Sequence, residues 1–119
     1  MELRHGTTRR RAEQIVQRGP DPHFREPGGQ PGDDGFSMCV AAGQFPFGTP
    51  AEYARGKAKQ FPNEGGPVIL IVDVPDDIVA KAVNEWFPLS QGLIQFDTGA
   101  GLEELLAAWP SLDKRIQDI

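Results

Sequence analysis

PVILIVDV, residues 67–74, is the most apolar stretch of the chain and predicts a buried central strand. Its β-branched residues favour extended backbone, and because apolar residues follow one another directly, we expect both faces of the strand to be covered. Residues 63–66 before it predict a turn. Asp76 and Asp77 after it predict the start of a short helix, since negative charge suits that end of the helix dipole. Helices are therefore expected to pack around this strand.

The N-terminal segment predicts a strand followed by a helix. Residues 2–5 form the candidate strand, and Thr7 or Thr8 is placed to cap a helix that ends at about Arg18, with Gly19 as its stop. Residues 19–34 then contain four glycines and four prolines, which predicts a long loop. A loop of this length is either a surface excursion or a lid beside a ligand.

The middle of the chain contains the clearest helix start. Thr49 suits the N-cap, Pro50 the first helical position and Glu52 the third, so a helix is expected from there to about Phe61. Residues 36–41 before it predict a buried strand.

The C-terminal part predicts one more strand, the last, over residues 92–96, and then helices only. A series of large apolar residues at helical spacing predicts an amphipathic helix after Gly101: Leu102, Leu105, Leu106 and Trp109. A final helix is expected to carry Leu112, Ile116 and Ile119. Together the elements predict an α+β domain.

Size and composition indicate a single domain over residues 1–119. Hydrophobic residues make up 39% of the chain and charged residues 24%, which is ordinary for a globular protein. The one cysteine, Cys39, has no partner for an internal disulfide, and no apolar run approaches the roughly 20 residues that cross a bilayer. We expect a cytoplasmic protein without a membrane partner. A net charge of −5 argues against general nucleic-acid binding.

Two groups of polar residues have competing interpretations. Arg4, with the three arginines of residues 9–11, forms either a solvated surface or a phosphate contact. His5, His23 and Cys39 lack the spacing of metal ligands, so no metal site is expected.

Four segments in a fixed order carry a resemblance to a known family: LRHGT at 3–7, GFSM at 35–38, Tyr53 one turn into the capped helix, and SQGLI at 90–94. This set resembles the ADP-ribosyltransferase superfamily, in the branch shared by diphtheria-type toxins and poly(ADP-ribose) polymerases. The resemblance spans the chain from Leu3 to about Phe96. It implies a split β-sheet core with flanking short helices. It also implies a domain that binds NAD and transfers ADP-ribose to a protein, nucleic-acid or small-molecule acceptor, with release of nicotinamide.

The resemblance assigns roles to the residues of these segments. His5 would hydrogen-bond a ribose hydroxyl, and the backbone of Gly6 would hold the nicotinamide amide, which needs one donor and one acceptor. The absence of a Cβ at Gly6 would let the ligand approach. Arg4, Thr7 and Ser37 would line the same cofactor site, with Thr7 supporting a turn or contacting the ligand.

Tyr53 matches the tyrosine that stacks on nicotinamide in this family, and its electron-rich ring face suits a pyridinium. It is expected to face His5 across a single crevice. Ser37, in contrast, occupies the position of another tyrosine of the family. Part of the usual aromatic pair is therefore either missing or supplied from the loops by Phe24, Phe45 or Phe47.

Gln91 falls at the position of the family's catalytic glutamate. Glutamine can hold a hydroxyl group, but it brings no negative charge to the oxocarbenium-like transition state. Three alternatives follow: Gln91 supports slow or specialised transfer, Glu85 or Asp97 replaces the glutamate, or the domain binds NAD or ADP-ribose without turnover. A related fold also carries NAD-dependent RNA 2′-phosphotransferase activity, for which the arginine group would recognise phosphate.

Overall fold

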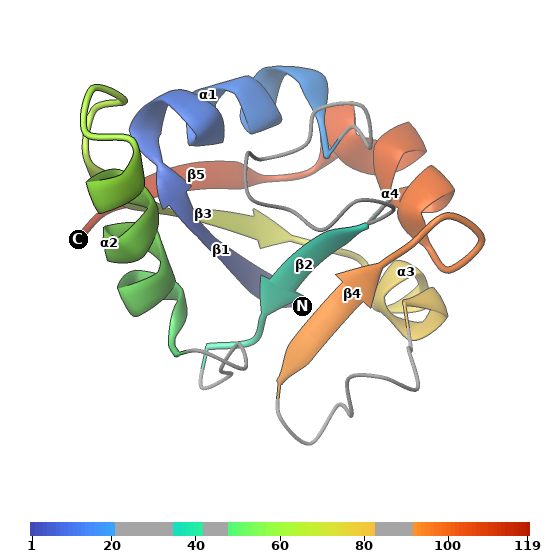
Figure 1. Cartoon of the computed structure of the whole chain (residues 1–119). Coiled ribbons are helices and arrows are strands. Elements are labelled where there is room, and N and C mark those ends of the chain that lie inside the picture. The colour runs from blue at the N-terminus through green and yellow to red at the C-terminus, as the bar shows by residue number, and fades with distance from the viewer. Residues whose placement is uncertain (21–34, 42–47, 83–91) are drawn as a thin grey trace.

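Strand β1 (Glu2–Thr8) lies at the centre of a five-stranded antiparallel sheet (Figure 1). The computed structural model describes residues 1–20, 35–41, 48–82 and 92–119. The strand order is β4-β2-β1-β3-β5. The other strands are β2 (Phe36–Cys39), β3 (Pro67–Asp73), β4 (Leu93–Phe96) and β5 (Lys114–Asp118). The predicted α+β class is thus confirmed.

Helices follow the strands at the predicted capping residues. Thr8 caps α1 (Arg9–Arg18) and Thr49 caps α2 (Pro50–Gln60), each accepting a backbone N–H on its hydroxyl. Gly19 ends α1 with a positive φ of 81°, which glycine adopts without a steric penalty because it has no Cβ. The other helices of the described residues are α3 (Asp76–Lys81), α4 (Leu102–Ala108) and the 3-10 helix η2 (Trp109–Ser111). The predicted caps are therefore confirmed. Caps can be predicted from the sequence because capping depends on residues that are close together in the chain.

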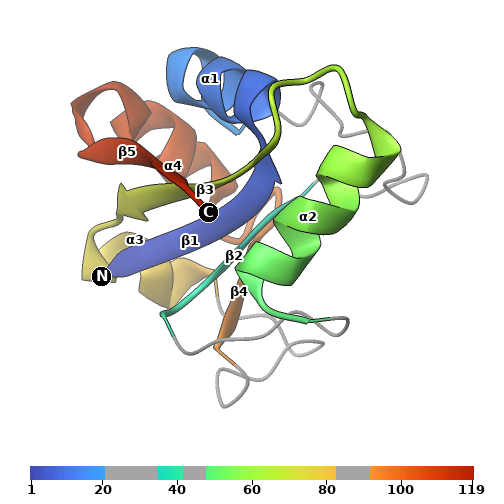
Figure 2. The same cartoon turned by 90° about the vertical axis from the view of Figure 1, so that its left-hand side faces the viewer.

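The sheet has two faces with different partners. Leu3, His5 and Thr7 of β1 project to one face, which we call the core face, where the main hydrophobic cluster joins Leu3 to Ile15 of α1 and Leu105 of α4. The even-numbered residues of β1 project to the other face, which we call the α2 face. Helix α2 packs there against β1 and β3 (Figure 2).

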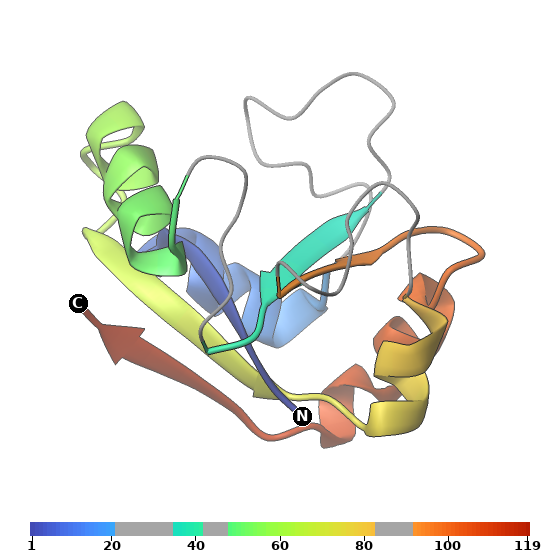
Figure 3. The same ribbon diagram turned by 90° about the horizontal axis from the view of Figure 1, so that it is seen from below.

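Strands β1 and β2 are paired over a much shorter length than β1 and β3. The β1–β3 ladder runs from Glu2 to Thr8, whereas the β1–β2 ladder has the single pair Arg4 and Cys39. Beyond that pair the two strands diverge, as Figure 3 shows. Strand β1 therefore stays paired with β3 along its whole length but separates from β2 after Arg4.

Two strand assignments made from the sequence were wrong. The first strand does not end at His5 but continues to Thr8, paired with β3 along its whole length. The final helix expected around Ile116 is instead β5, so residues 92–96 do not contain the last strand. The apolar residues Leu112 and Ile116 are four apart, a spacing that fits either structure. The segment forms a strand because the edge of β3 that faces away from β1 pairs with it in a ladder of backbone hydrogen bonds.

Candidate functional site

Hydrogen bonds along β1 alternate between its two neighbours, as in any antiparallel sheet. The nitrogen and carbonyl of Met1 bond with the carbonyl and N–H of Val74, at 2.7 and 2.9 Å, and the N–H of Arg9 donates to the carbonyl of Gly66 at 3.0 Å. These bonds pair the odd-numbered residues of β1 with β3. The N–H and C=O of Gly6 therefore point toward β2.

Strand β2 alternates in the same way between β1 and β4. The N–H of Val40 donates to the carbonyl of Gly92 at 2.9 Å, so even-numbered residues of β2 bond with β4. The backbone groups of Ser37 and Cys39 consequently face β1. If the ladder continued beyond Cys39, its next hydrogen-bonded pair would join Ser37 to Gly6.

A histidine side chain replaces that missing pair. Nδ1 of His5 lies 2.8 Å from the carbonyl oxygen of Ser37. A carbonyl oxygen only accepts hydrogen bonds, so Nδ1 carries the proton, and in the neutral ring Nε2 is then the acceptor. We call this place the β1–β2 junction and define it by His5, Gly6 and Ser37.

Packing holds the His5 ring in place from the core face. The ring centroid lies 4.6 Å from that of Phe36, at an interplanar angle of 33°, and Phe36 meets Trp109 edge-on at 6.4 Å. His5 as a whole is buried. Its ring therefore has both a fixed hydrogen-bond partner and a fixed orientation.

Gly6 has a structural reason to be glycine that differs from the one expected. A Cβ built on Gly6 would lie 2.0 Å from the carbonyl oxygen of Pro50 and 3.1 Å from the nitrogen of Ala54. Both atoms belong to the backbone of α2. This helix therefore fills the space beside the Gly6 Cα, where a ligand was predicted from the sequence. The N–H and C=O of Gly6 project at right angles to that contact, toward β2.

Three polar residues and one glycine form a row across β2 and β4 on the α2 face, which we call the polar strip: Gly35, Ser37, Gln95 and Asp97. The hydroxyl of Ser37 donates to Oε1 of Gln95, and Nε2 of Gln95 donates to Oδ1 of Asp97 at 2.9 Å. A Cβ on Gly35 would lie 1.9 Å from Nε2 of Gln95, so glycine makes room for this amide. Sequence reasoning missed Gln95. The available signal was a polar residue inside an otherwise apolar strand.

Tyr53 and His5 lie on opposite sides of the sheet. Tyr53 is half-buried on α2, with Nζ of Lys57 5.7 Å from its ring centroid, and α2 packs on the face opposite the His5 ring. The expectation that His5 and Tyr53 face each other across a single crevice was therefore wrong. Tyr53 is nevertheless one helical turn from Pro50, the residue that contacts Gly6.

The remaining predicted site residues have mixed positions. Arg4 forms the last β1–β2 pair before the junction, and its guanidinium bonds Glu2 at 3.0 Å. Thr7 is fully buried on the core face, within β1 rather than at a turn. Asp97 belongs to the polar strip. Gln91 and Glu85 lie outside the described residues, as do Phe24, Phe45 and Phe47.

Three of the four N-terminal arginines bind carboxylates within the chain. Arg9 pairs with Asp118, in addition to the Arg4–Glu2 pair. Arg11 is buried and holds Glu64 through Nε at 2.7 Å and Nη2 at 3.2 Å, with its guanidinium 4.2 Å from the Phe61 ring centroid. These pairings favour a structural role over the phosphate contact considered from the sequence.

The Arg11–Glu64 pair makes stability depend on pH. The guanidinium of Arg11 and then the hydroxyl of Thr8 lower the pKa of Glu64 below its usual value. A lowered pKa in the folded state stabilises the fold above the unfolded pKa, near 4.3, and this contribution is lost as pH falls through the folded pKa.

Glu64→Gln is therefore expected to lower the free energy of unfolding by about 2 kcal/mol at pH 7. The difference in stability between the two proteins should shrink on acidification below about pH 4. Protonation of Glu64 then removes from wild type the ion pair with Arg11 that the variant already lacks. Thermal melts across this range measure both effects. An equal difference at every pH would contradict the assigned ion pair.

Cys39 is a core residue, as predicted, and has no exposed surface. Burial raises the pKa of its thiol to about 11. The thiol therefore stays protonated at neutral pH, and the thiolate that nucleophilic chemistry requires does not form.

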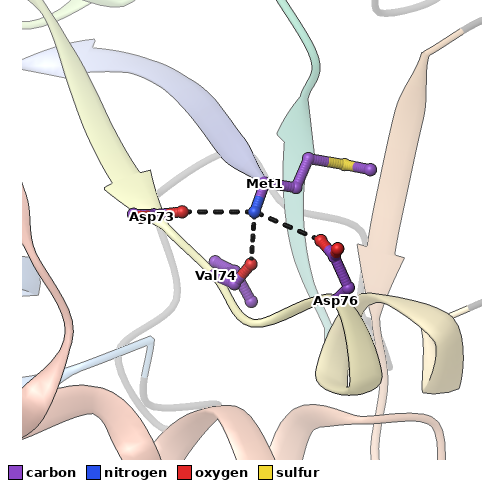
Figure 4. Close-up of polar contacts among 4 residues, drawn as sticks. All are labelled: Met1, Asp73, Val74 and Asp76. Carbon is purple, nitrogen blue, oxygen red and sulfur yellow. Dashed lines mark hydrogen bonds and ion pairs between the residues drawn. The ribbon is translucent and has the colours of Figure 1, made fainter.

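A recess of about 370 Å³ lies away from the junction, next to the first residue of the chain. The Met1 ammonium bonds Asp73 at 3.2 Å, Asp76 at 3.3 Å and the carbonyl of Val74 at 2.7 Å (Figure 4). The Asp73 hydrogen bond is the largest cause that raises the pKa of this ammonium. The carboxylates here thus bind the chain's own cation.

The described residues contain no cluster of His, Cys, Asp or Glu arranged to hold a metal ion. Within the same residues, no helix has both the length and the apolar character needed to cross a membrane.

Comparisons with known proteins identify no relative: no protein-family model, curated protein or solved structure matches this chain.

Proposed function

We propose that the β1–β2 junction binds NAD by its nicotinamide end, and that the domain transfers ADP-ribose with release of nicotinamide. The observation that carries the proposal is the direction of the Gly6 N–H and C=O, which point toward β2 beyond the last ladder pair. A carboxamide needs one acceptor and one donor, and these two groups supply both from a single residue. The resemblance of residues 3–7 to an NAD-binding strand supports the same ligand.

His5 is suited to the ribose next to that nicotinamide. The Ser37 carbonyl holds the proton on Nδ1, which makes Nε2 the acceptor in the neutral ring. A ribose hydroxyl is a donor of the right kind for this atom. Because the ring packs on the core face, a ligand held by both His5 and Gly6 would run through the junction between the strands.

The polar strip supports recognition of an amide rather than an acid. Ser37 donates its proton to Gln95, and the Gln95 amide is oriented by Asp97. The lone pairs of the Ser37 oxygen are consequently the groups available for a further hydrogen bond, and they accept an N–H.

Binding without turnover is the second candidate, and one observation favours it. Cleavage of the nicotinamide bond builds positive charge on the ribose, which a carboxylate would stabilise. The carboxylate of the polar strip, Asp97, is hydrogen-bonded to the Gln95 amide. The Asp97 carboxylate therefore holds the Gln95 side chain, at the place where a transferase would need a catalytic acid.

Calorimetric titration with NAD, followed by chromatographic assay of nicotinamide, separates these functions. Saturable binding with release of nicotinamide supports the transferase, and equal binding without release over a long incubation supports the binding module. Nicotinic acid serves as the matched control, because it lacks the amide N–H groups, and it should bind more weakly than nicotinamide. No heat at millimolar NAD would overturn both candidates.

A further inference from the structure

The outer edge of β5 presents backbone N–H and C=O groups to the outside of the sheet. Strand β5 is the last strand in the sheet order, next to β3 alone, and it forms the sheet margin in Figures 1 and 3. Among the described strands, none pairs with its other edge. An open edge of this kind is a template for another strand.

Alternation identifies which groups face outward. The N–H of Asp73 donates to the carbonyl of Asp113 at 3.0 Å, so odd-numbered residues of β5 bond with β3. The N–H and C=O groups of Lys114, Ile116 and Asp118 therefore point away from the sheet. Any strand added at this edge has to bond to those three residues.

We propose that a second copy of this chain adds to this edge, with the two β5 strands antiparallel about Ile116. In this register Ile116 is opposite Ile116 of the second copy, and Lys114 is opposite Asp118. Each of these pairs joins residues whose backbone groups face outward, so each exchanges two hydrogen bonds. The result is one sheet continuous through both copies.

Charge complementarity selects both the partner and the register. Opposite charges directly across a ladder are favourable, and like charges are unfavourable. Centring the pair on Lys114, Arg115 or Asp118 places a charged residue opposite itself. Centring it on Gln117 places the charged Asp118 opposite the apolar Ile116. The Ile116 register is the one that matches both Lys114–Asp118 pairs.

The side chains in question are held beside the edge by contacts within the chain. Nζ of Lys114 donates to the carbonyl of Trp109, and Asp118 pairs with Arg9. Charged residues at sheet edges often prevent association. Here the two signs are related by the symmetry of an antiparallel pair, so they favour it instead.

A charge-swap experiment tests the interface. Lys114→Asp places aspartates opposite aspartates, and Asp118→Lys places lysines opposite lysines, so each variant alone should be monomeric. An equimolar mixture restores both opposite-charge pairs and should form heterodimers. In sedimentation equilibrium, wild type and the mixture should rise with concentration toward twice the 13.0 kDa of one chain, while each variant alone should not. Circular dichroism of each variant verifies folding.

Amide hydrogen exchange of wild type provides a measurement that needs no variant. The amides of Lys114, Ile116 and Asp118 should become protected as concentration increases, whereas those of Arg115 and Gln117, bonded to β3, should be protected throughout. The proposal is overturned if wild type stays monomeric at every concentration, if the separate variants dimerise as well as wild type, if the mixture stays monomeric, or if the outward amides exchange equally fast at high and low concentration.

Discussion

Gly6→Ala is expected to lower the free energy of unfolding by about 3 kcal/mol, near the upper end for overpacking of a buried site. The added methyl group would overlap the Pro50 carbonyl oxygen, 2.0 Å from the ideal Cβ position, and Ala54 lies just behind it. Because the opposing atoms are backbone, α2 as a whole has to shift away from β1. For a chain of this length, such a loss lowers the melting temperature by about 10 °C.

Gly56→Ala is the matched control within α2. A Cβ at Gly56 would meet no atom within 4 Å, and alanine is the better helix former. This variant should gain about 0.5–1 kcal/mol, so the two substitutions change stability in opposite directions. Chemical denaturation measures both. A Gly6→Ala protein as stable as wild type would mean that α2 does not pack on β1 as described.

Replacing His5 is expected to give the second large effect, on ligand binding as well as on stability. His5→Ala removes the hydrogen bond to the Ser37 carbonyl and the ring contact with Phe36. We expect about 2 kcal/mol less stability and NAD binding weaker by about 10- to 100-fold, if Nε2 accepts a ribose hydroxyl.

Two further variants separate the structural task of His5 from its proposed binding task. The amide nitrogen of His5→Asn can replace Nδ1 as the donor to Ser37, so this variant should recover much of the stability but not the affinity for NAD. The longer His5→Gln places its polar end nearer Nε2, so it should recover affinity in preference to stability. Denaturation without ligand and calorimetry with NAD give the two readouts. Wild-type NAD affinity in all three variants would remove His5 from the site.

Local signals explain which parts of the fold could be predicted from the sequence. The N-caps at Thr8 and Thr49 and the apolar β3 stretch depend on residues close together in the chain, and all three are confirmed. Strand β5 depends instead on a partner more than forty residues away in the sequence, at the free edge of β3. Its polar residues gave no comparable local signal, so a helix was expected there.

The candidate site shows the same division. The motifs selected His5, Gly6 and Ser37, and the structure brings these three together at the junction. Tyr53 was harder to place, because its side of the sheet depends on how α2 crosses β1. Gln95 was missed, since only the β2–β4 register sets it opposite Ser37.

Amide chemical shifts measured by NMR during titration with nicotinamide test the central claim most directly. The account predicts a saturable shift of the Gly6 amide, accompanied by Ser37, with the Gly56 amide unchanged. Saturable shifts confined to another region, such as the recess at Met1, with Gly6 unmoved, would contradict it.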